Sequence, residues 1–244
     1  MGIVRYRDFG RDGWPYRFFN RRFLFPALVL LVCQTGWLSA AEGTAPHAEL
    51  TFEQIDGFRH EKKWTEILAA LGEGDLSTKA GALGTNLDQV YYLRGQAHAA
   101  LKEGEAAEAD YKLALESAQE KDPRRQEYLA SLAVNYKNNL NNPSAALDYY
   151  RQTIDLCFEL TNRMGSTPVG CTIDAAALLR QEGKYDEAMV LLQRYDDAMI
   201  EALIPVWRIK LLRAFAEVYL GQGQEDKAKE CYDKISQLEG IATP

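Results

Sequence analysis

Apolar and small residues recur along the chain with the period of an α-helix, and one pattern returns at intervals of about forty residues. Two segments show it most clearly, with a small residue, a glycine, an alanine and a packing residue at matching offsets: Ala176, Leu179, Gly183, Tyr185, Ala188 and Leu192, and Phe215, Ala216, Tyr219, Gly223, Ala228 and Tyr232. Such self-similarity is typical of stacked helical units that bury their apolar faces on one another. No segment alternates with period two over a useful length. We therefore predict an all-α chain without a sheet.

The pattern predicts a repeat domain over residues 51–240, built from four to five antiparallel helix hairpins. We expect hairpins at 51–72, 87–121, 122–160, 167–203 and 205–240. Residues 72–86 carry four glycines and little periodicity, so they are expected to form the longest connector, with at most one irregular turn. The second helix of the fourth hairpin can continue to Leu203, where Pro205 stops it.

Several helix boundaries have side-chain signals. Thr51 and Gln54 form a capping-box pattern, and Asn86 is expected to cap the next helix. A capping side chain followed by proline at the first helical position recurs at Asp122-Pro123, Asn142-Pro143 and Thr167-Pro168. Gly183 is free to take the left-handed conformation that ends a helix.

The first 41 residues differ in composition from the rest and predict an export signal. Arginines precede the apolar run from Phe23 to Val32, and Ser39-Ala40-Ala41 then supplies the small residues of a cleavage site before Glu42. Residues 1–41 are therefore interpreted as a signal peptide, and 42–50 as a flexible leader. An uncleaved N-terminal anchor is the alternative, and a lipoprotein cysteine at Cys33 is a further one. All three place the repeat domain outside the cytoplasm, in the periplasm or otherwise exported.

Charge and cysteine content narrow the possible partners. Residues 1–41 carry six arginines and two aspartates, or +4, and subtracting this from the total of −7 leaves −11 for the remainder. A repeat domain with this net negative charge argues against nucleic acid or an anionic membrane surface as the partner.

Three cysteines follow the predicted signal peptide. We predict a disulfide between Cys157 and Cys171, because a short loop joins the two helices that carry them. The competing interpretation is that each is a small buried apolar residue, as is Cys231.

The chain lacks the motifs of the common catalytic and metal sites. It contains three histidines, and no His-x-x-x-His, Cys-x-x-Cys or glycine-rich phosphate loop. We therefore expect no catalytic residues, no metal site and no cofactor.

At Tyr91-Tyr92-Leu93-Arg94-Gly95 with Ala109-Asp110-Tyr111, and at Gly183-Lys184-Tyr185-Asp186-Glu187-Ala188, the chain resembles the tetratricopeptide repeat family. The resemblance implies an α-solenoid with a right-handed superhelical path. The spacing of about forty residues exceeds the family's unit of 34, so longer loops or helices have to absorb the difference, and a Sel1-like repeat is the structural alternative. The small residues Ala176, Ala188, Ala216 and Ala228 are expected where paired helices touch, and the aromatic residues Tyr136, Tyr150, Tyr219 and Tyr232 have the spacing of packing residues.

The same resemblance implies recognition of a partner on the inner, concave face lined by the first helix of each hairpin. In this register the face includes Gln89, Tyr92, Gln96, Lys137, Asn138, Arg180, Gln181, Lys210, Arg213 and Glu217. Its row of cations suits an extended acidic segment or a chain-terminal carboxylate. Ordinary solvated helix residues are the competing interpretation.

The sequence therefore predicts a non-catalytic protein-interaction scaffold or adaptor of the bacterial cell envelope, which touches a membrane only through an uncleaved N-terminal segment. Two other functions stay open. The first is a carrier or receptor for a non-protein ligand such as a glycan, which favours several exposed aromatic residues in the groove. The second is an enzyme whose site is assembled from distant residues.

Overall fold

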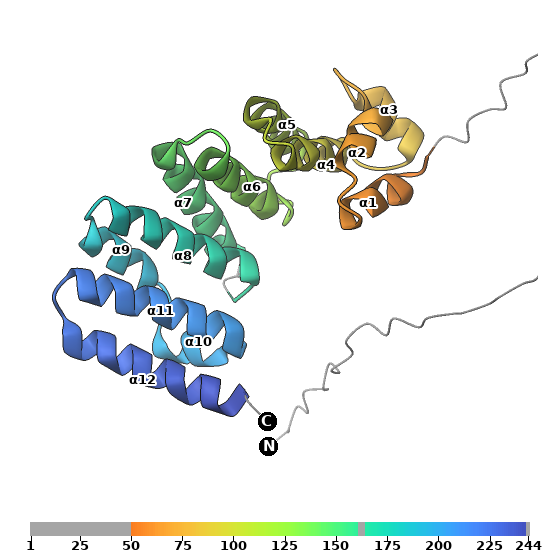
Figure 1. Cartoon of the computed structure of the whole chain (residues 1–244). Coiled ribbons are helices and arrows are strands. Elements are labelled where there is room, and N and C mark those ends of the chain that lie inside the picture. The colour runs from red at the N-terminus through yellow and green to blue at the C-terminus, as the bar shows by residue number, and fades with distance from the viewer. Residues whose placement is uncertain (1–49, 161–163, 243–244) are drawn as a thin grey trace, which may run out of the picture. The chain divides into compact units, whose positions relative to one another are not determined.

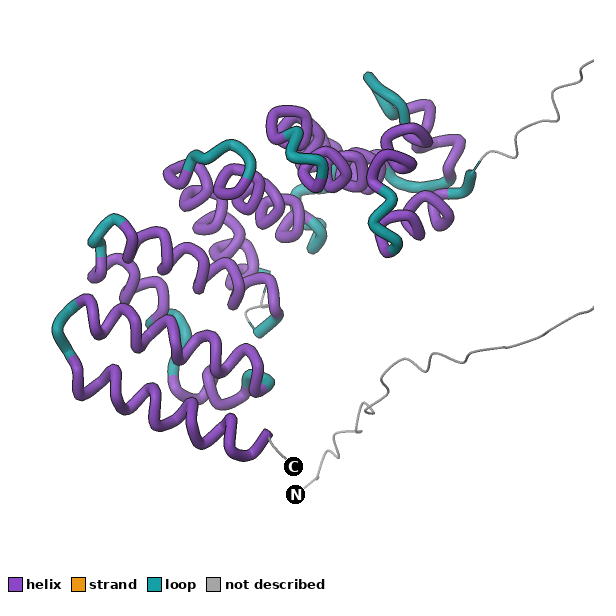
Figure 2. The backbone as a smooth tube through the Cα atoms, viewed as in Figure 1, coloured by secondary structure: helices purple, strands orange, loops and turns teal. Residues whose placement is uncertain are grey.

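The computed structural model describes residues 50–160 and 164–242, and this part of the chain consists of helices joined by short loops, without a strand (Figure 2). The described residues all belong to one compact unit. The predicted signal peptide or anchor (1–41), and nearly all of the leader (42–50), lie outside the described residues.

Twelve helices make up the described part. The first group is α1 (Phe52–His60), α2 (Trp64–Leu71) and α3 (Ser77–Leu83). Two hairpins follow: α4 (Leu87–Ala100) with α5 (Gly104–Ser117), and α6 (Arg125–Asn138) with α7 (Pro143–Glu159). The remainder is α8 (Ser166–Gln181), α9 (Tyr185–Leu192), α10 (Asp197–Ala202), α11 (Pro205–Gly221) and α12 (Glu225–Ala242).

Consecutive hairpins pack side by side, so the chain is an α-solenoid of antiparallel helix hairpins, as predicted (Figure 1). We call the first helix of a hairpin its A helix (α4, α6, α8 and α11) and the second its B helix (α5, α7, α9 and α12). Each of α6, α8 and α11 packs on the hairpin before it. Contacts are therefore mostly between neighbours along the sequence.

Small residues allow the A and B helices of a hairpin to approach closely. Ala176 and Ala188, and Ala216 and Ala228, are all buried, which confirms their predicted place in the core. Gly95 plays this part in α4, because a β-carbon there would lie 2.8 Å from two ring carbons of the buried Tyr111 in α5.

The boundary signals were partly correct. The Thr51 capping box is present, with the Thr51 hydroxyl accepting the Gln54 amide at 3.3 Å and the Gln54 side chain accepting the Thr51 amide at 2.9 Å. Asn142 accepts the Ala145 amide at 3.1 Å, and Pro143 is the first residue of α7. Gly183 has the left-handed φ of 73° that was expected after α8.

Other boundary predictions were wrong. Asp122 accepts the Arg124 amide at 2.8 Å within a turn, so α6 begins at Arg125 and Pro123 does not start it. Thr167 lies inside α8, which begins at Ser166. Asn86 is the N-cap residue of α4, as predicted, but its side chain makes no capping bond. In the first two cases a competing local turn or an earlier start replaces the expected cap.

The connector between α2 and α4 holds a helix, α3, where at most an irregular turn was expected. Asp75 accepts the Ser77 amide at 2.9 Å at its start, and Gly84 ends it with a φ of 64°. Leu76 and Ala80 are buried in the core of the first hairpins. Tertiary packing therefore stabilises a segment whose own sequence has little periodicity.

The fourth hairpin also differs from the expectation of one long second helix. The chain breaks after α9, and Asp196 accepts the Met199 amide at 2.8 Å to begin the separate helix α10. Tyr195, within the break, is buried. Burying this side chain favours a turn over a straight helix.

A buried ion pair joins the two helices of the α4–α5 hairpin. The Arg94 guanidinium donates to both Asp110 carboxylate oxygens, at 2.8 and 2.6 Å, and the two side chains are 8% and 4% exposed. Its remaining Nη1 donates to the carbonyl oxygens of Gly72 and Gly74, both at 3.0 Å. One side chain of α4 thus holds α5 and the connector after α2 together.

Candidate functional site

The predicted binding residues all lie on A helices. Gln89, Tyr92 and Gln96 are in α4, Lys137 and Asn138 in α6, Arg180 and Gln181 in α8, and Lys210, Arg213 and Glu217 in α11. We call the surface that these residues mark the A-helix face. Many of their side chains contact the neighbouring A helix, so the face has a structural part as well as an accessible one.

Tyr92 connects α4 to α6. Its hydroxyl and that of Ser131 share a hydrogen bond of 3.2 Å, and its ring centroid lies 4.7 Å from that of Tyr128. Burial raises the pKa of the Tyr92 hydroxyl above its ordinary value. Nearby, Gln89 accepts a hydrogen bond of 2.7 Å from Thr85. Tyr92 therefore contributes more to packing between hairpins than to an open surface.

Lys137 bridges α6 to α8 through Asp174. The Lys137 ammonium lies 3.0 Å from one Asp174 carboxylate oxygen and 5.8 Å from the centroid of the Tyr150 ring. The Tyr150 hydroxyl donates to the other carboxylate oxygen at 3.2 Å. Burial, with the nearby Asp174 carboxylate, raises the pKa of Tyr150. Asp174 thus accepts from a cation of the previous A helix and from a tyrosine of the previous B helix.

Arg180 makes the corresponding bridge from α8 to α11. Its guanidinium lies 3.1 Å from the Glu217 carboxylate, and the sequence separation of 37 residues is the same as between Lys137 and Asp174. The other two predicted cations also have contacts within the chain. Lys210 stands over the Trp207 ring at 4.4 Å, and Arg213 lies 3.6 Å from Glu239. The four cations are thus partly neutralised or stacked, and do not form a bare basic row.

A cavity of about 330 Å³ hollows the A-helix face between α4 and α6. Its lining combines the small residues Ala99 and Ala130 with the polar groups of Ser131 and Asn138. Val134, also in the lining, is 41% exposed. The site offers an apolar contact beside hydroxyl and amide groups, which suits a short side chain and the backbone of a bound segment.

Neither a metal centre nor a membrane span emerges from the described helices. They hold no group of three or more His, Cys, Asp or Glu side chains placed to bind a metal ion. Within residues 50–160 and 164–242, no helix combines the length and apolar character needed to cross a bilayer.

Sequence comparison identifies the repeat. The family model described as "Tetratricopeptide repeat" matches residues 88–121, the α4–α5 hairpin, and residues 214–240, most of α11–α12. These two segments are similar to that repeat. No curated protein matches it significantly in sequence.

Solved structures share the arrangement of stacked helix hairpins. BtubC (BKLC) from P. vanneervenii is 18% identical, with a TM-score of 0.63 over 78% of this chain and 80% of that one. A putative kinesin light chain with nearly identical TPR-like repeats, from Podosopora anserina, is 14% identical, with a TM-score of 0.60 over 78% and 94%. MamA is 14% identical, with a TM-score of 0.58 over 79% and 98%. At these identities the similarity shows the fold alone.

Sequence reasoning missed the residues that pair with the predicted cations. Asp174 and Glu217 lie one helix hairpin further along the chain than Lys137 and Arg180. The common separation of 37 residues was the available signal, because opposite charges one repeat apart are brought together when A helices stack. Glu217 was assigned to the face, but not as the partner of Arg180.

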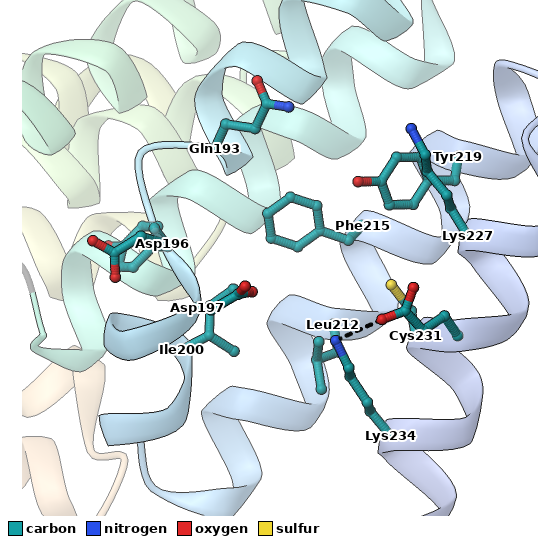
Figure 3. Close-up of a pocket in the computed structure, with 12 residues that line it drawn as sticks. Gln193, Asp196, Asp197, Ile200, Leu212, Phe215, Tyr219, Lys227, Cys231 and Lys234 are labelled. Atoms are coloured by element: carbon teal, nitrogen blue, oxygen red, sulfur yellow. Dashed lines mark ion pairs between the residues drawn. The ribbon is translucent and has the colours of Figure 1, made fainter.

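The sequence also gave no sign of a cavity of about 480 Å³ beside the break between α9 and α10. Figure 3 shows Phe215 projecting between Asp196 and Asp197 on one side and Lys227 and Tyr219 on the other. The wall formed by α12 carries an ion pair of 3.0 Å between Lys234 and Glu230. The cavity is lined by α11, α12 and the segment between Gln193 and Ile200, and its lining contains none of the residues that mark the A-helix face.

The three described cysteines are all buried free thiols in this structure. Burial raises the pKa of the Cys157 thiol to about 11 and that of Cys171 to about 12. Cys157 donates to the Gln126 side chain at 3.0 Å. The disulfide between Cys157 and Cys171 stays a prediction for the protein in an oxidising compartment.

Proposed function

We propose that the chain is a non-catalytic interaction scaffold of the bacterial cell envelope, which binds an extended segment of a partner protein on its A-helix face. Tetratricopeptide repeats typically bind other proteins or peptides and typically serve as scaffolds without catalytic activity. The observation that carries the proposal is the cavity between α4 and α6, where the exposed Val134 lies beside Ser131 and Asn138.

The charge of the partner segment belongs to the same proposal. An acidic segment or a chain-terminal carboxylate would share Lys137 and Arg180 with Asp174 and Glu217. Both pairs are partly exposed, so water and ions already weaken them, and a bound carboxylate can replace one acceptor at little cost. The bridges therefore leave room for an acidic partner, at lower affinity than a row of unpaired cations.

The envelope setting is supported by the N-terminal sequence. The Ser39-Ala40-Ala41 site after the apolar run favours export and cleavage before Glu42. N-terminal sequencing of the protein from an envelope fraction is expected to find Glu42 or a close neighbour. An intact Met1 would favour the membrane anchor.

Crosslinked capture from the envelope fraction, with peptide identification, tests the binding mode. The variant Val134→Glu places a charge in the cavity and is expected to reduce capture by about ten-fold, since its stability should change by only about 0.5 kcal/mol. Val190→Glu is the matched control, because Val190 is also an exposed valine and lies on the B helix α9. Equal capture by the two variants would exclude this cavity as the binding site.

A further inference from the structure

The last hairpin leaves exposed a position that the earlier hairpins bury. Four residues after the buried alanine of each B helix stand Tyr111, Tyr150, Leu192 and Tyr232. The first three are 3%, 1% and 0% exposed, whereas Tyr232 is 40% exposed. The next A helix accounts for the difference, because Tyr150 donates to Asp174 of α8, and α11 packs on α9, which carries Leu192.

The A helices show the same contrast at an offset of 40 residues, which also relates Gly183 to Gly223. In α8, a β-carbon at Gly170 would lie 3.6 Å from Trp207 of α11, Ile173 packs against the core, and Arg180 pairs with Glu217. The counterparts in α11 are Lys210, Arg213 and Leu220, and all three are exposed.

We propose that the terminal surface, formed by Val206, Lys210, Arg213, Leu220 and Tyr232, binds an amphipathic helix of a partner protein whose apolar stripe is flanked by carboxylates. The first four residues have the spacing of one side of a helix, and Tyr232 adds to it from α12. A helix is the shape that fits, because the next A helix covers the corresponding positions in each earlier hairpin.

The charges of the terminal surface define the partner's chemistry. Lys210 lies over the Trp207 ring and Arg213 lies 3.6 Å from the exposed carboxylate of Glu239. Both cations are exposed, so they can also pair with carboxylates at the edge of the docked helix. Asp174 provides the internal template, since it accepts from both the tyrosine and the lysine of the preceding hairpin. A carboxylate on the partner would accept a hydrogen bond from the Tyr232 hydroxyl, as Asp174 does from Tyr150.

A second copy of the chain suits this surface less well. The exposed side chains of α1, the only A-type helix at the other end of the described stack, are the polar Glu53, Gln54 and His60, without an apolar stripe. If the terminal surfaces of two copies faced each other, Lys210 and Arg213 of one copy would repel those of the other. Residues 1–41 carry a charge of +4 and would be repelled similarly.

The inference shares Lys210 and Arg213 with the A-helix face of the proposed function, but it does not depend on the cavity at Val134. The probe is a synthetic amphipathic helix of about 20 residues with a leucine stripe flanked by glutamates, compared with a peptide in which every glutamate is replaced by lysine. Fluorescence anisotropy with the full chain is expected to give about ten-fold tighter binding of the acidic peptide.

Three variants locate the site. The double variant Leu220→Ser with Tyr232→Ser is expected to weaken acidic-peptide binding by about ten-fold, and Lys210→Glu with Arg213→Glu to reverse the preference between peptides. The control, Lys79→Glu with Lys121→Glu, makes the same charge change at two exposed lysines of the first half of the domain and should bind as the parent does. Circular dichroism checks that each variant remains helical.

Equal affinity for the two peptides, no binding of either, or unchanged binding by the terminal-surface variants would overturn the proposal. Sedimentation velocity tests whether a second copy of the chain binds the terminal surface instead. Self-association of the parent chain that Tyr232→Ser abolishes would show that a second copy occupies the surface, and would likewise overturn it. Val134→Glu should leave peptide binding intact, so failure of the A-helix-face proposal is distinguishable from failure of this one.

Discussion

Gly95 shows how a single missing side chain sets the distance between two helices. Its α-carbon faces the ring of Tyr111, and both residues are buried. The β-carbon of Asp110 lies 3.2 Å from the position that a β-carbon at Gly95 would take. Because Asp110 is fixed by its ion pair with Arg94, neither neighbour can move away easily.

We predict that Gly95→Ala lowers the free energy of unfolding by about 1–3 kcal/mol, since the added methyl group overpacks this contact. Urea denaturation followed by circular dichroism measures the change. Gly57→Ala in α1 is the control, because no atom lies within 4 Å of its added β-carbon. It should be neutral or stabilise by up to about 1 kcal/mol, from helix propensity. A Gly95→Ala protein as stable as Gly57→Ala would contradict the close-approach argument.

The buried thiols give a pH-dependent prediction at the same scale. Because burial raises the pKa of Cys157 to about 11 and that of Cys171 to about 12, the native thiols stay protonated at pH 8. Their contribution to stability is complete below the unfolded pKa of about 8.5 and is lost as the pH rises through the folded values. Alkylation by iodoacetamide at pH 8 should be at least about ten-fold slower in the native protein than in urea.

Peptide mapping without reductant, on protein from its native compartment, complements that measurement. Three alkylatable thiols would rule out the predicted bond between Cys157 and Cys171. Rapid alkylation of native protein would instead show that these side chains are less buried than the structure has them.

At the residue scale the sequence predicted burial better than it predicted partners. The alanines at 176, 188, 216 and 228 are buried because small size at a fixed offset reports directly on close helix packing. Tyr232 has the spacing of a packing residue but is 40% exposed, because burial there depends on a following helix. Spacing within one hairpin contains no information about what covers that hairpin.

The bridges between A helices belong to the element scale, and they are not equivalent. Glu217 pairs with Arg180 where both side chains are more than a third exposed. Asp174 accepts from the partly exposed Lys137, but also from the hydroxyl of Tyr150, a residue that is 1% exposed. Removing Asp174 leaves a buried hydroxyl without its acceptor, whereas removing Glu217 exposes a cation to water.

We therefore predict that Asp174→Ala destabilises the protein by about 1–3 kcal/mol, the cost of an unsatisfied buried polar group. Glu217→Ala should change stability by less than about 1 kcal/mol, and its effect should shrink as salt is added. Denaturation of both variants at low and high salt measures this. Equal losses would mean that the ion pair, and not the tyrosine hydroxyl, determines the contribution of Asp174.

Elements with strong periodicity were predicted well, and those decided by tertiary packing were not. Residues 77–83 form α3 because Leu76 and Ala80 reach the core next to α4, and no local pattern indicates this. The break at Tyr195 likewise follows from burial of that side chain. Asp196 as a helix cap was the local signal, but the uninterrupted apolar pattern up to Leu203 favoured one helix.

At the scale of the whole molecule, contacts between neighbouring hairpins imply that stability varies along the stack. In such a nearest-neighbour system, an internal hairpin is stabilised from two sides and a terminal one from one side. The α6–α7 hairpin packs on both α5 and α8, whereas α12 packs mainly on α11 within the described residues. We expect the terminal hairpin to open without the rest.

Two chemically identical substitutions test this expectation. Ile154→Ala in α7 and Ile235→Ala in α12 each remove a buried side chain, at a cost of about 2–5 kcal/mol. Hydrogen exchange measured by mass spectrometry should show faster exchange confined to α11 and α12 for Ile235→Ala. Ile154→Ala should accelerate exchange in the neighbouring hairpins as well and lower the global midpoint. Identical exchange maps would indicate a single cooperative unit.

The contacts of Arg94 also bear on how such a chain evolves. A hairpin that touches its neighbours only through apolar surface can be duplicated, deleted or exchanged as a module. Arg94 binds Asp110 in its own hairpin and the carbonyl oxygens of Gly72 and Gly74 ahead of it. Loss of the segment before Leu87 would expose this ion pair to water and remove the two carbonyl oxygens to which Arg94 donates. The first hairpin, α3 and the α4–α5 hairpin are therefore expected to be inherited together, as one unit of recombination.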